Sequence, residues 1–144
     1  MENGANLTIG KDCWIQDHVC IFVHGLNNAG ITMGNEVLIG RNSIIRNHDK
    51  HTILNLETNL PTNPPASVVL GNHLWLTQHI TILKGTHIAD GCMVANLAIL
   101  SREFDKPNCL IAGVPAKIVR EQVGWDIRTY AEYVHDNKLD TTEA

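Results

Sequence analysis

A short run of the sequence, from Asn47 to Thr52, contains residues that can move a proton near neutral pH. His51 carries an imidazole, which titrates close to neutrality and can take the proton of a substrate hydroxyl as that hydroxyl attacks. Asp49 stands two positions earlier, where its carboxylate could orient the imidazole or hold a substrate. Trp75 offers an indole N–H, which donates a hydrogen bond and accepts none. These side chains predict a site for proton transfer, provided that the fold brings them together.

The elements that must position these residues are marked by an apolar residue that recurs at every sixth position. Neither the 3.6-residue period of a helix nor the two-residue period of an ordinary strand produces such a repeat. Residues two positions before each apolar residue are mostly small and share its inward direction. Three flat sides would close one coil of about 18 residues, and each coil would add ~4.8 Å to the axis. The period therefore predicts an all-β fold, a parallel β-helix of about four to five coils. The repeating positions are Ile9, Ile15, Ile21, Met33, Ile39, Ile45 and His51, then Leu70, Leu76, Ile82, Ile88, Val94 and Leu100.

The repeat is interrupted once and is followed by a different pattern. The interruption contains three prolines and several polar residues, which cannot continue an inward column, so we expect an extruded loop. From Trp125 to about Lys138, apolar residues recur at helical spacing. We expect a single domain, 1–144, with coils at about 7–51 and 68–103, the extruded loop at 52–67, and the C-terminal tail and helix at 104–144.

The composition argues against several classes of partner. The net charge of −4 offers no basic stripe for nucleic acid. Membrane insertion is not expected, because the sequence has no apolar run of about 18 residues. The first residues lack the basic and apolar regions of a signal peptide, and the four cysteines show no Cys-x-x-Cys pairing. We therefore expect a cytoplasmic protein with reduced thiols.

Three stretches carry motifs that occur together in a known family. The first is Asn47-His-Asp-Lys-His-Thr52, which contains an Asp-x-His segment, and the second is 70–85, with Leu-Gly-Asn-His-Leu-Trp-Leu and Thr-Ile-Leu-Lys-Gly. The third is 108–120, with Ala-Gly-Val-Pro-Ala-Lys. In this order they resemble the hexapeptide-repeat O-acetyltransferases, in the group that acetylates sugars, capsular polysaccharides and xenobiotics. The resemblance implies left-handed coils, a homotrimer, acetyl-CoA in a groove between subunits, and a small-molecule or glycan acceptor.

The same resemblance implies roles for individual residues. His51 aligns with the catalytic base of the family, and Trp75 with a tryptophan near the thioester. Asp49 would orient the imidazole or hold the acceptor, and Asn63, in the loop, would contribute to the acceptor pocket. No metal is expected. The residues expected to bind the cofactor are Trp75, Thr77, Ala95, Arg102, Ala112, Gly113, Lys117 and Arg120.

One segment departs from the family pattern and keeps a second hypothesis open. Asn96 and Leu97 are bulkier than expected beside the predicted cofactor groove, and Thr77 replaces a residue that is usually small. A trimeric β-helix that serves as a binding scaffold, with a degraded cofactor groove, is therefore an alternative. We nevertheless predict an acetyl-CoA-dependent O-acetyltransferase with His51 as its general base.

A third hypothesis comes from the eight histidines. Trimeric β-helices of the γ-class carbonic anhydrases bind a metal through histidines that are shared between chains. The candidates are two pairs, each six residues apart and so on equivalent corners of adjacent sides. That spacing differs from the one in those enzymes, and the hypothesis leaves the acyltransferase tail unexplained. The pairs are His18 with His24, and His73 with His79.

Overall fold

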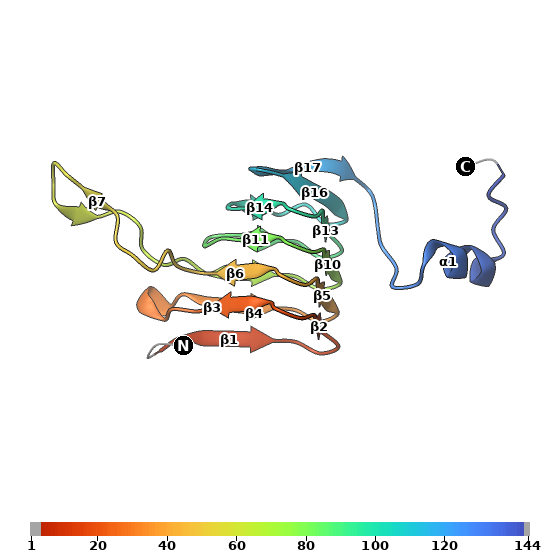
Figure 1. Ribbon diagram of the computed structural model, residues 1–144, viewed down its shortest axis with the longest axis horizontal. Coiled ribbons are helices and arrows are strands. Elements are labelled where there is room, and N and C mark those ends of the chain that lie inside the picture. The colour runs from red at the N-terminus through yellow and green to blue at the C-terminus, as the bar shows by residue number, and fades with distance from the viewer. Residues whose placement is uncertain (1–3, 143–144) are drawn as a thin grey trace.

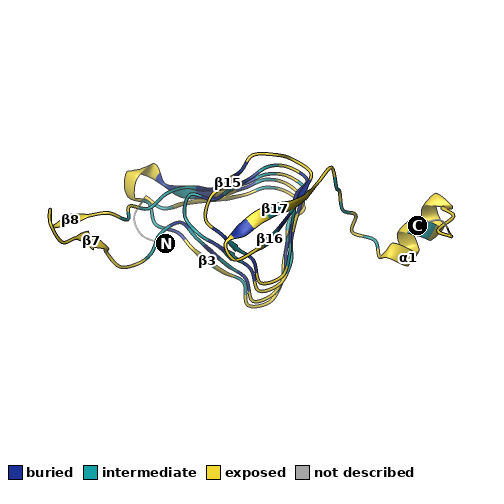
Figure 2. Cartoon of the chain, turned by 90° about the horizontal axis from the view of Figure 1, so that it is seen from above, coloured by how far each residue is buried: buried dark blue, intermediate teal, exposed yellow. Residues whose placement is uncertain are grey.

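The computed structural model describes residues 4–142, which form a column of stacked coils (Figure 1). Three sheets make the three sides of the column, which is triangular when seen from above (Figure 2). Sheet A contains β1 (Asn6–Ile9), β4 (Gly30–Met33), β9 (Val68–Leu70), β12 (His87–Ile88) and β15 (Glu103–Phe104). Sheet B contains β2 (Trp14–Ile15), β5 (Val37–Ile39), β10 (Leu74–Leu76), β13 (Met93–Val94), β16 (Cys109–Gly113) and β17 (Ala116–Glu121). Sheet C contains β3 (Cys20–Phe22), β6 (Ile44–Arg46), β11 (Thr81–Ile82) and β14 (Ile99–Leu100).

The chain visits sheets A, B and C in turn, and each visit places one strand parallel to the strand of the previous coil. Four coils have a strand in all three sheets, and β15 and β16 begin a fifth. The strand β17 then turns back and pairs antiparallel with β16. These observations confirm the all-β parallel β-helix and the number of coils predicted from the period. The coils continue past residue 103, where the sequence placed the beginning of the tail.

The inward positions of the repeat form the core. In sheet B, Ile15, Ile39 and Leu76 lie in register in successive coils. Ile39 and Leu76 are fully buried, whereas Ile15 is 39% exposed, because it belongs to the first coil and no described coil covers it from below. Burial therefore rises from the first coil to the second, although the sequence period is the same in both.

The corners of the coils use left-handed backbone. The corner between sheets A and B has a positive φ in every coil, and so does the corner between sheets B and C. Leu97 occupies the second of these corners with a φ of 66° and is 68% exposed. Its neighbour Asn96 accepts a hydrogen bond through Oδ1 from the main-chain N–H of Gln78, at 3.1 Å. The bulky pair thus forms a corner with left-handed backbone, a conformation that favours glycine, so the structure gives no reason for a residue as large as Leu97 at this position.

A bulge at one corner lengthens the first coil and still preserves the period of six. Ile9 pairs with Met33, 24 residues later, whereas Leu70 pairs with Ile88, 18 residues later. The six additional residues of the first coil include the 3-10 turn η1 (Leu26–Asn28). Because the insertion equals one repeat, the inward phase is retained after it.

Two segments stand away from the column (Figures 1 and 2). The extruded loop leaves sheet C after β6 and contains the antiparallel hairpin of β7 (Leu54–Asn55) and β8 (Leu60–Pro61). The helix α1 (Tyr130–Asn137) is shorter than the pattern indicated, because it begins at a capping box formed by Thr129 and Glu132. No residue of α1 is buried, so the helix does not pack back onto the coils of its own chain. In the described part of the chain, no helix has the length and hydropathy needed to cross a membrane.

Candidate active site

A cavity of about 450 Å³ lies where the extruded loop leaves the column, and we call it the mouth cavity. His51 lines it, as do Asp49 and Asn63, so three of the predicted site residues share one cavity. An imidazole here can take a proton from a hydroxyl held in the cavity. The cavity also contains His48 and Lys50, to which the sequence assigned no role, and His24, which the sequence offered only as a candidate metal ligand with His18.

Asn63 ties the two ends of the loop together. Its Nδ2 donates to the main-chain oxygen of His51 at 2.8 Å and to Oδ2 of Asp49 at 3.0 Å. Its Oδ1 accepts from the main-chain N–H of Ile53 at 2.7 Å. The contacts of this side chain are therefore made inside the loop, where they fix the position of the segment that carries His51.

The carboxylate of Asp49 is paired with a lysine from a later coil. Lys84 Nζ donates to Asp49 Oδ2, which also accepts from Asn63. Lys84 lowers the pKa of Asp49 from its ordinary value of 3.8, and the hydrogen bond from Asn63 lowers it further, although burial opposes both effects. Within residues 4–142, no hydrogen bond joins Asp49 to the ring of His51. The carboxylate thus anchors the base of the loop, a contact that the sequence did not indicate.

The ion pair predicts a pH-dependent contribution to stability. A carboxyl group whose pKa is lowered on folding stabilises the native state above its unfolded pKa, and this contribution disappears as the pH falls through the folded value. We expect Lys84→Met to reduce the free energy of unfolding at pH 7 by on the order of 1 kcal/mol, and the difference from wild type to shrink below pH 3.8. Urea unfolding at several pH values measures this difference. A difference that stays constant with pH would contradict the assignment.

His24 and His48 lie side by side in the mouth cavity, with ring centroids 5.6 Å apart. The buried Asn47 holds His24 through two main-chain contacts: its Oδ1 accepts from His24 N and its Nδ2 donates to His24 O, both at 2.8 Å. The sequence could not reveal this pair, because the two histidines belong to different coils. They meet because His24 follows β3 and His48 follows β6, and these two strands are paired in successive coils.

A second cavity, of about 850 Å³, lies against the outer face of sheet B, and we call it the sheet B groove. Trp75, Thr77 and Ala95 line it, as the resemblance implied for a cofactor site. Trp75 is 40% exposed, and its register neighbours Leu38 and Met93 also line the groove. Thr77 turns its hydroxyl away to donate to the main-chain oxygen of Val94 at 2.7 Å.

The far wall of the sheet B groove comes from the segment before α1. Trp125 stacks on His73 with ring centroids 4.4 Å apart and an interplanar angle of 12°, and its Nε1 donates to the main-chain oxygen of His73 at 2.9 Å. Trp125 also lies 6.1 Å from Trp75, measured between ring centroids. The sequence placed Trp125 at the start of the predicted helical segment and gave it no function.

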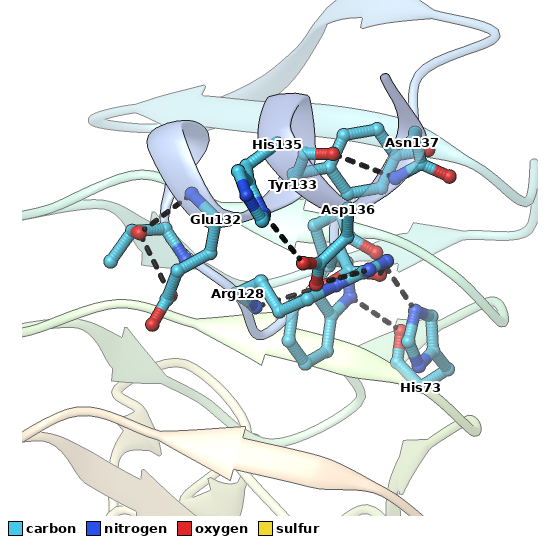
Figure 3. A network of polar contacts seen from close by, with 10 residues as sticks. His73, Arg128, Glu132, Tyr133, His135, Asp136 and Asn137 are labelled. Carbon is cyan, nitrogen blue, oxygen red and sulfur yellow. Dashed lines mark hydrogen bonds and ion pairs between the residues drawn. The ribbon is translucent and has the colours of Figure 1, made fainter. Parts of the chain in front are cut away.

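A polar network holds this segment to α1 (Figure 3). Arg128 forms ion pairs with Asp126 at 2.8 Å and with Asp136 at 3.2 Å, and its guanidinium lies 4.7 Å from the ring centroid of Tyr133. Arg128 lowers the pKa of Asp126 to about 2. The guanidinium is therefore engaged within the C-terminal segment, where it orients the helix relative to the groove wall.

The other residues predicted to bind the cofactor lie outside this groove. Ala112 pairs with Lys117 in the β16–β17 hairpin, and Gly113 and Arg120 belong to the same hairpin at the end of the column. Arg102 lies between sheets C and A, with its guanidinium 5.3 Å from the ring centroid of Phe104. Within one chain, the predicted cofactor residues therefore occupy three separate places.

The described residues contain one cluster with the composition of a metal site. It consists of His87, Glu103 and Asp105 on sheet A, with possible ligand atoms within 4.8 Å of one another. The cluster has a single imidazole and is largely exposed. It includes none of the histidine pairs weighed for a carbonic anhydrase site.

The fold and the two cavities define a class of protein: a β-helix with an imidazole-rich cavity at the mouth of an extruded loop. No model of a protein family matches the chain. Among curated proteins, a polysialic acid O-acetyltransferase of Neisseria meningitidis is 38% identical over 107 residues, which are 74% of this chain and 50% of that relative. The chain spans about half the length of the curated relatives it matches.

Solved structures agree with this similarity. A crystal structure of a polysialic acid O-acetyltransferase is 32% identical, covers 93% of this chain and 68% of its own, and has a TM-score of 0.60. A hexapeptide-repeat-containing acetyltransferase from Vibrio cholerae O1 biovar eltor, complexed with acetyl coenzyme A, has a TM-score of 0.62 at 23% identity, with 83% of this chain and 61% of its own covered. The second likeness shows the shared fold. The chain belongs to the hexapeptide-repeat O-acetyltransferase family, and its coils are left-handed.

Proposed function

We propose that this protein transfers an acetyl group from acetyl-CoA to a hydroxyl of a sugar, glycan or related small molecule, with His51 as the general base. The observation that carries the proposal is the position of His51 in the mouth cavity, on a segment whose main chain is fixed by Asn63. The relatives are O-acetyltransferases by name, which supports the reaction type.

In this reaction the chain supplies a proton acceptor and a binding site. Acetyl-CoA, when bound, supplies an acetyl group that is activated as a thioester. His51 accepts the proton of the attacking hydroxyl, so that a new C–O bond can form while the C–S bond breaks, and the imidazolium then returns the proton to the departing thiolate. Such proton transfer typically contributes ~10²–10⁴-fold to the rate. In this proposal Trp75 steadies the thioester through its indole N–H.

We assign the long pantetheine arm of that donor to the sheet B groove, whose lining supports this proposal. Its floor contains Trp75, Leu38 and Met93, which provide an apolar surface, and Ala95 adds a small side chain to the lining. A groove lined by apolar side chains with a few polar groups is typical of a cofactor site. Lys117 and Arg120 are proposed to contact the phosphates from a neighbouring subunit.

The two cavities of one chain share no lining residue, which supports a site assembled from two subunits. The outer face of sheet B carries an apolar column, in which Trp14 is 61% exposed. A closed trimer would cover this column and bring His51 of one subunit close to Trp75 of the next. The exposed aromatic residues of α1, Tyr130 and Tyr133, would then contact a neighbour.

Thermal unfolding in the presence of acetyl-CoA tests the donor without knowledge of the acceptor. A ligand at 100 times its Kd stabilises the native state by about 2.7 kcal/mol per site, so a saturable rise in Tm is expected. ATP serves as the phosphate control, and sedimentation equilibrium of the same sample checks for the trimer. If a folded trimer shows no rise in Tm at millimolar acetyl-CoA, the binding-scaffold hypothesis replaces this one.

A further inference from the structure

The segment between β17 and α1 forms one wall of the sheet B groove, although it contains no helix or strand of its own. Five consecutive residues of this segment, 125–129, line the groove. The helix α1 stands away from the coils and buries none of its residues, so it does not press the segment against them (Figure 1). The position of the wall therefore depends on the contacts that Trp125 makes with the coils.

Trp125 is held to the column by three contacts with His73. The two rings are stacked, with centroids 4.4 Å apart and an interplanar angle of 12°. Trp125 Nε1 donates to the main-chain oxygen of His73 at 2.9 Å, and His73 Nε2 lies 3.2 Å from the main-chain oxygen of Trp125 (Figure 3). On its other edge, His73 Nδ1 lies 3.1 Å from Oε2 of Glu36, a residue of the coil below. The imidazole is thus fixed by the column and in turn fixes the indole.

The indole of Trp125 faces the groove, whereas the imidazole of His73 does not. Trp125 lines the groove together with Trp75, and the centroids of their rings lie 6.1 Å apart at an interplanar angle of 42°. His73 is not among the residues that line the groove. An effect of His73 on a ligand in the groove is therefore expected to pass through Trp125.

The charges of this wall suit an uncharged ligand group. Asp126 and Arg128 both line the groove, but they form an ion pair with each other at 2.8 Å, and Arg128 also pairs with Asp136. The wall therefore offers no unpaired cation to a phosphate. The pantetheine arm of acetyl-CoA is uncharged and consists of methylene, methyl and amide groups. Indole rings provide a large apolar surface against which such groups can pack.

We propose that Trp125 binds the pantetheine arm of acetyl-CoA opposite Trp75, and that His73 is the positioning residue that holds Trp125 in place. This inference rests on the proposed function, since it takes the sheet B groove as the donor site. Trp125 contacts the donor itself. His73 acts through the stacked ring and the two hydrogen-bonding contacts, and it touches no part of the donor.

The dissociation constant of acetyl-CoA, measured by isothermal titration calorimetry, tests both roles. Trp125→Ala should raise Kd by roughly 3- to 10-fold, the scale of one aromatic contact, and Trp125→Phe should recover most of the affinity because it retains a ring. His73→Asn should also raise Kd, since asparagine tolerates the left-handed backbone of this corner, with a φ of 52°, but cannot stack on the indole. His79→Asn is the matched control, because His79 has a φ of 55° at the next corner and lies outside the groove.

A double variant separates positioning from a general effect on the fold. If His73 acts through Trp125, then His73→Asn should have no further effect on Kd once Trp125→Ala has removed the indole. Both substitutions lie outside the buried core, so the variants should retain the far-UV circular dichroism of the wild type. Losses in affinity that add in the double variant would overturn the role of His73.

Fragments of the donor locate the contact with Trp125. Saturation-transfer NMR should detect S-acetylpantetheine on the wild type, and Trp125→Ala should weaken that signal while it leaves the signal of adenosine bisphosphate unchanged. No signal from S-acetylpantetheine on the wild type, or one that Trp125→Ala leaves intact, would overturn the assignment to the arm.

The wild type distinguishes failure of this inference from failure of the proposed function. A wild-type protein that binds no acetyl-CoA would reject both. Normal binding of acetyl-CoA by the wild type, with the same Kd in Trp125→Ala, would reject the role of Trp125 and retain the acetyltransferase.

Discussion

His51→Ala should lower the turnover number for acetyl transfer by at least ~10²-fold, while acetyl-CoA binding and oligomeric state remain those of the wild type. The physical reason is that a hydroxyl has a pKa far above neutrality and attacks slowly without a base beside it. The main chain of residue 51 accepts the bond from Asn63, and alanine retains this contact. Release of CoA with an acidic and a neutral glycan acceptor measures the effect. Near-normal turnover in this variant would remove His51 from the mechanism.

A mixing experiment tests whether His51 and Trp75 act across a subunit interface. Neither Trp75→Ala nor His51→Ala trimers should be active, because every site lacks one of the two groups. Trimers that are dissociated and reassembled from both variants should regain part of the activity, since some interfaces then combine an intact His51 with an intact Trp75. His79→Ala, at an exposed corner, is the matched histidine control. Reassembled mixtures that stay inactive would place both groups in the same subunit's site.

Ile39→Ala should destabilise the protein by about 2–5 kcal/mol, the range for removal of a large aliphatic side chain from a close-packed interior. Ile39 is fully buried in the sheet B column, between Ile15 below it and Leu76 above it. The substitution leaves a cavity that the stacked main chains cannot close, because strand spacing fixes the distance between coils. The free energy of unfolding from urea denaturation measures the loss.

The matched control is Ile15→Ala, one coil below. It is the same substitution in the same column, but Ile15 is 39% exposed, so less apolar surface returns to water on mutation. We expect Ile15→Ala to cost less than half as much as Ile39→Ala. Equal losses would show that the first coil is covered in solution, for example by another chain.

Several features of the protein were predictable from the sequence. The period of six marks the residues that are buried, because the inward positions of a β-helix recur at a fixed spacing along the chain. Inward residues such as Ile39 and Leu76 were therefore recognised without a structure. Each motif is also a short stretch of consecutive residues that can be read directly from the sequence. The motifs therefore identified the family and the loop that carries His51. The role of each site residue remains a prediction, because family membership does not establish it.

The sequence by itself determined the coil, its inward face and the family, because each of these depends on residues close together in the chain. Only the tertiary structure decided which distant side chains meet. Lys84 reaches Asp49 across 35 residues, and Trp125 reaches His73 across 52. These contacts depend on how corners, the six-residue bulge and the loop bring one coil above another. A periodic sequence specifies the stacking of coils, but it does not specify which polar groups lie opposite each other at the irregular corners where the two cavities are found.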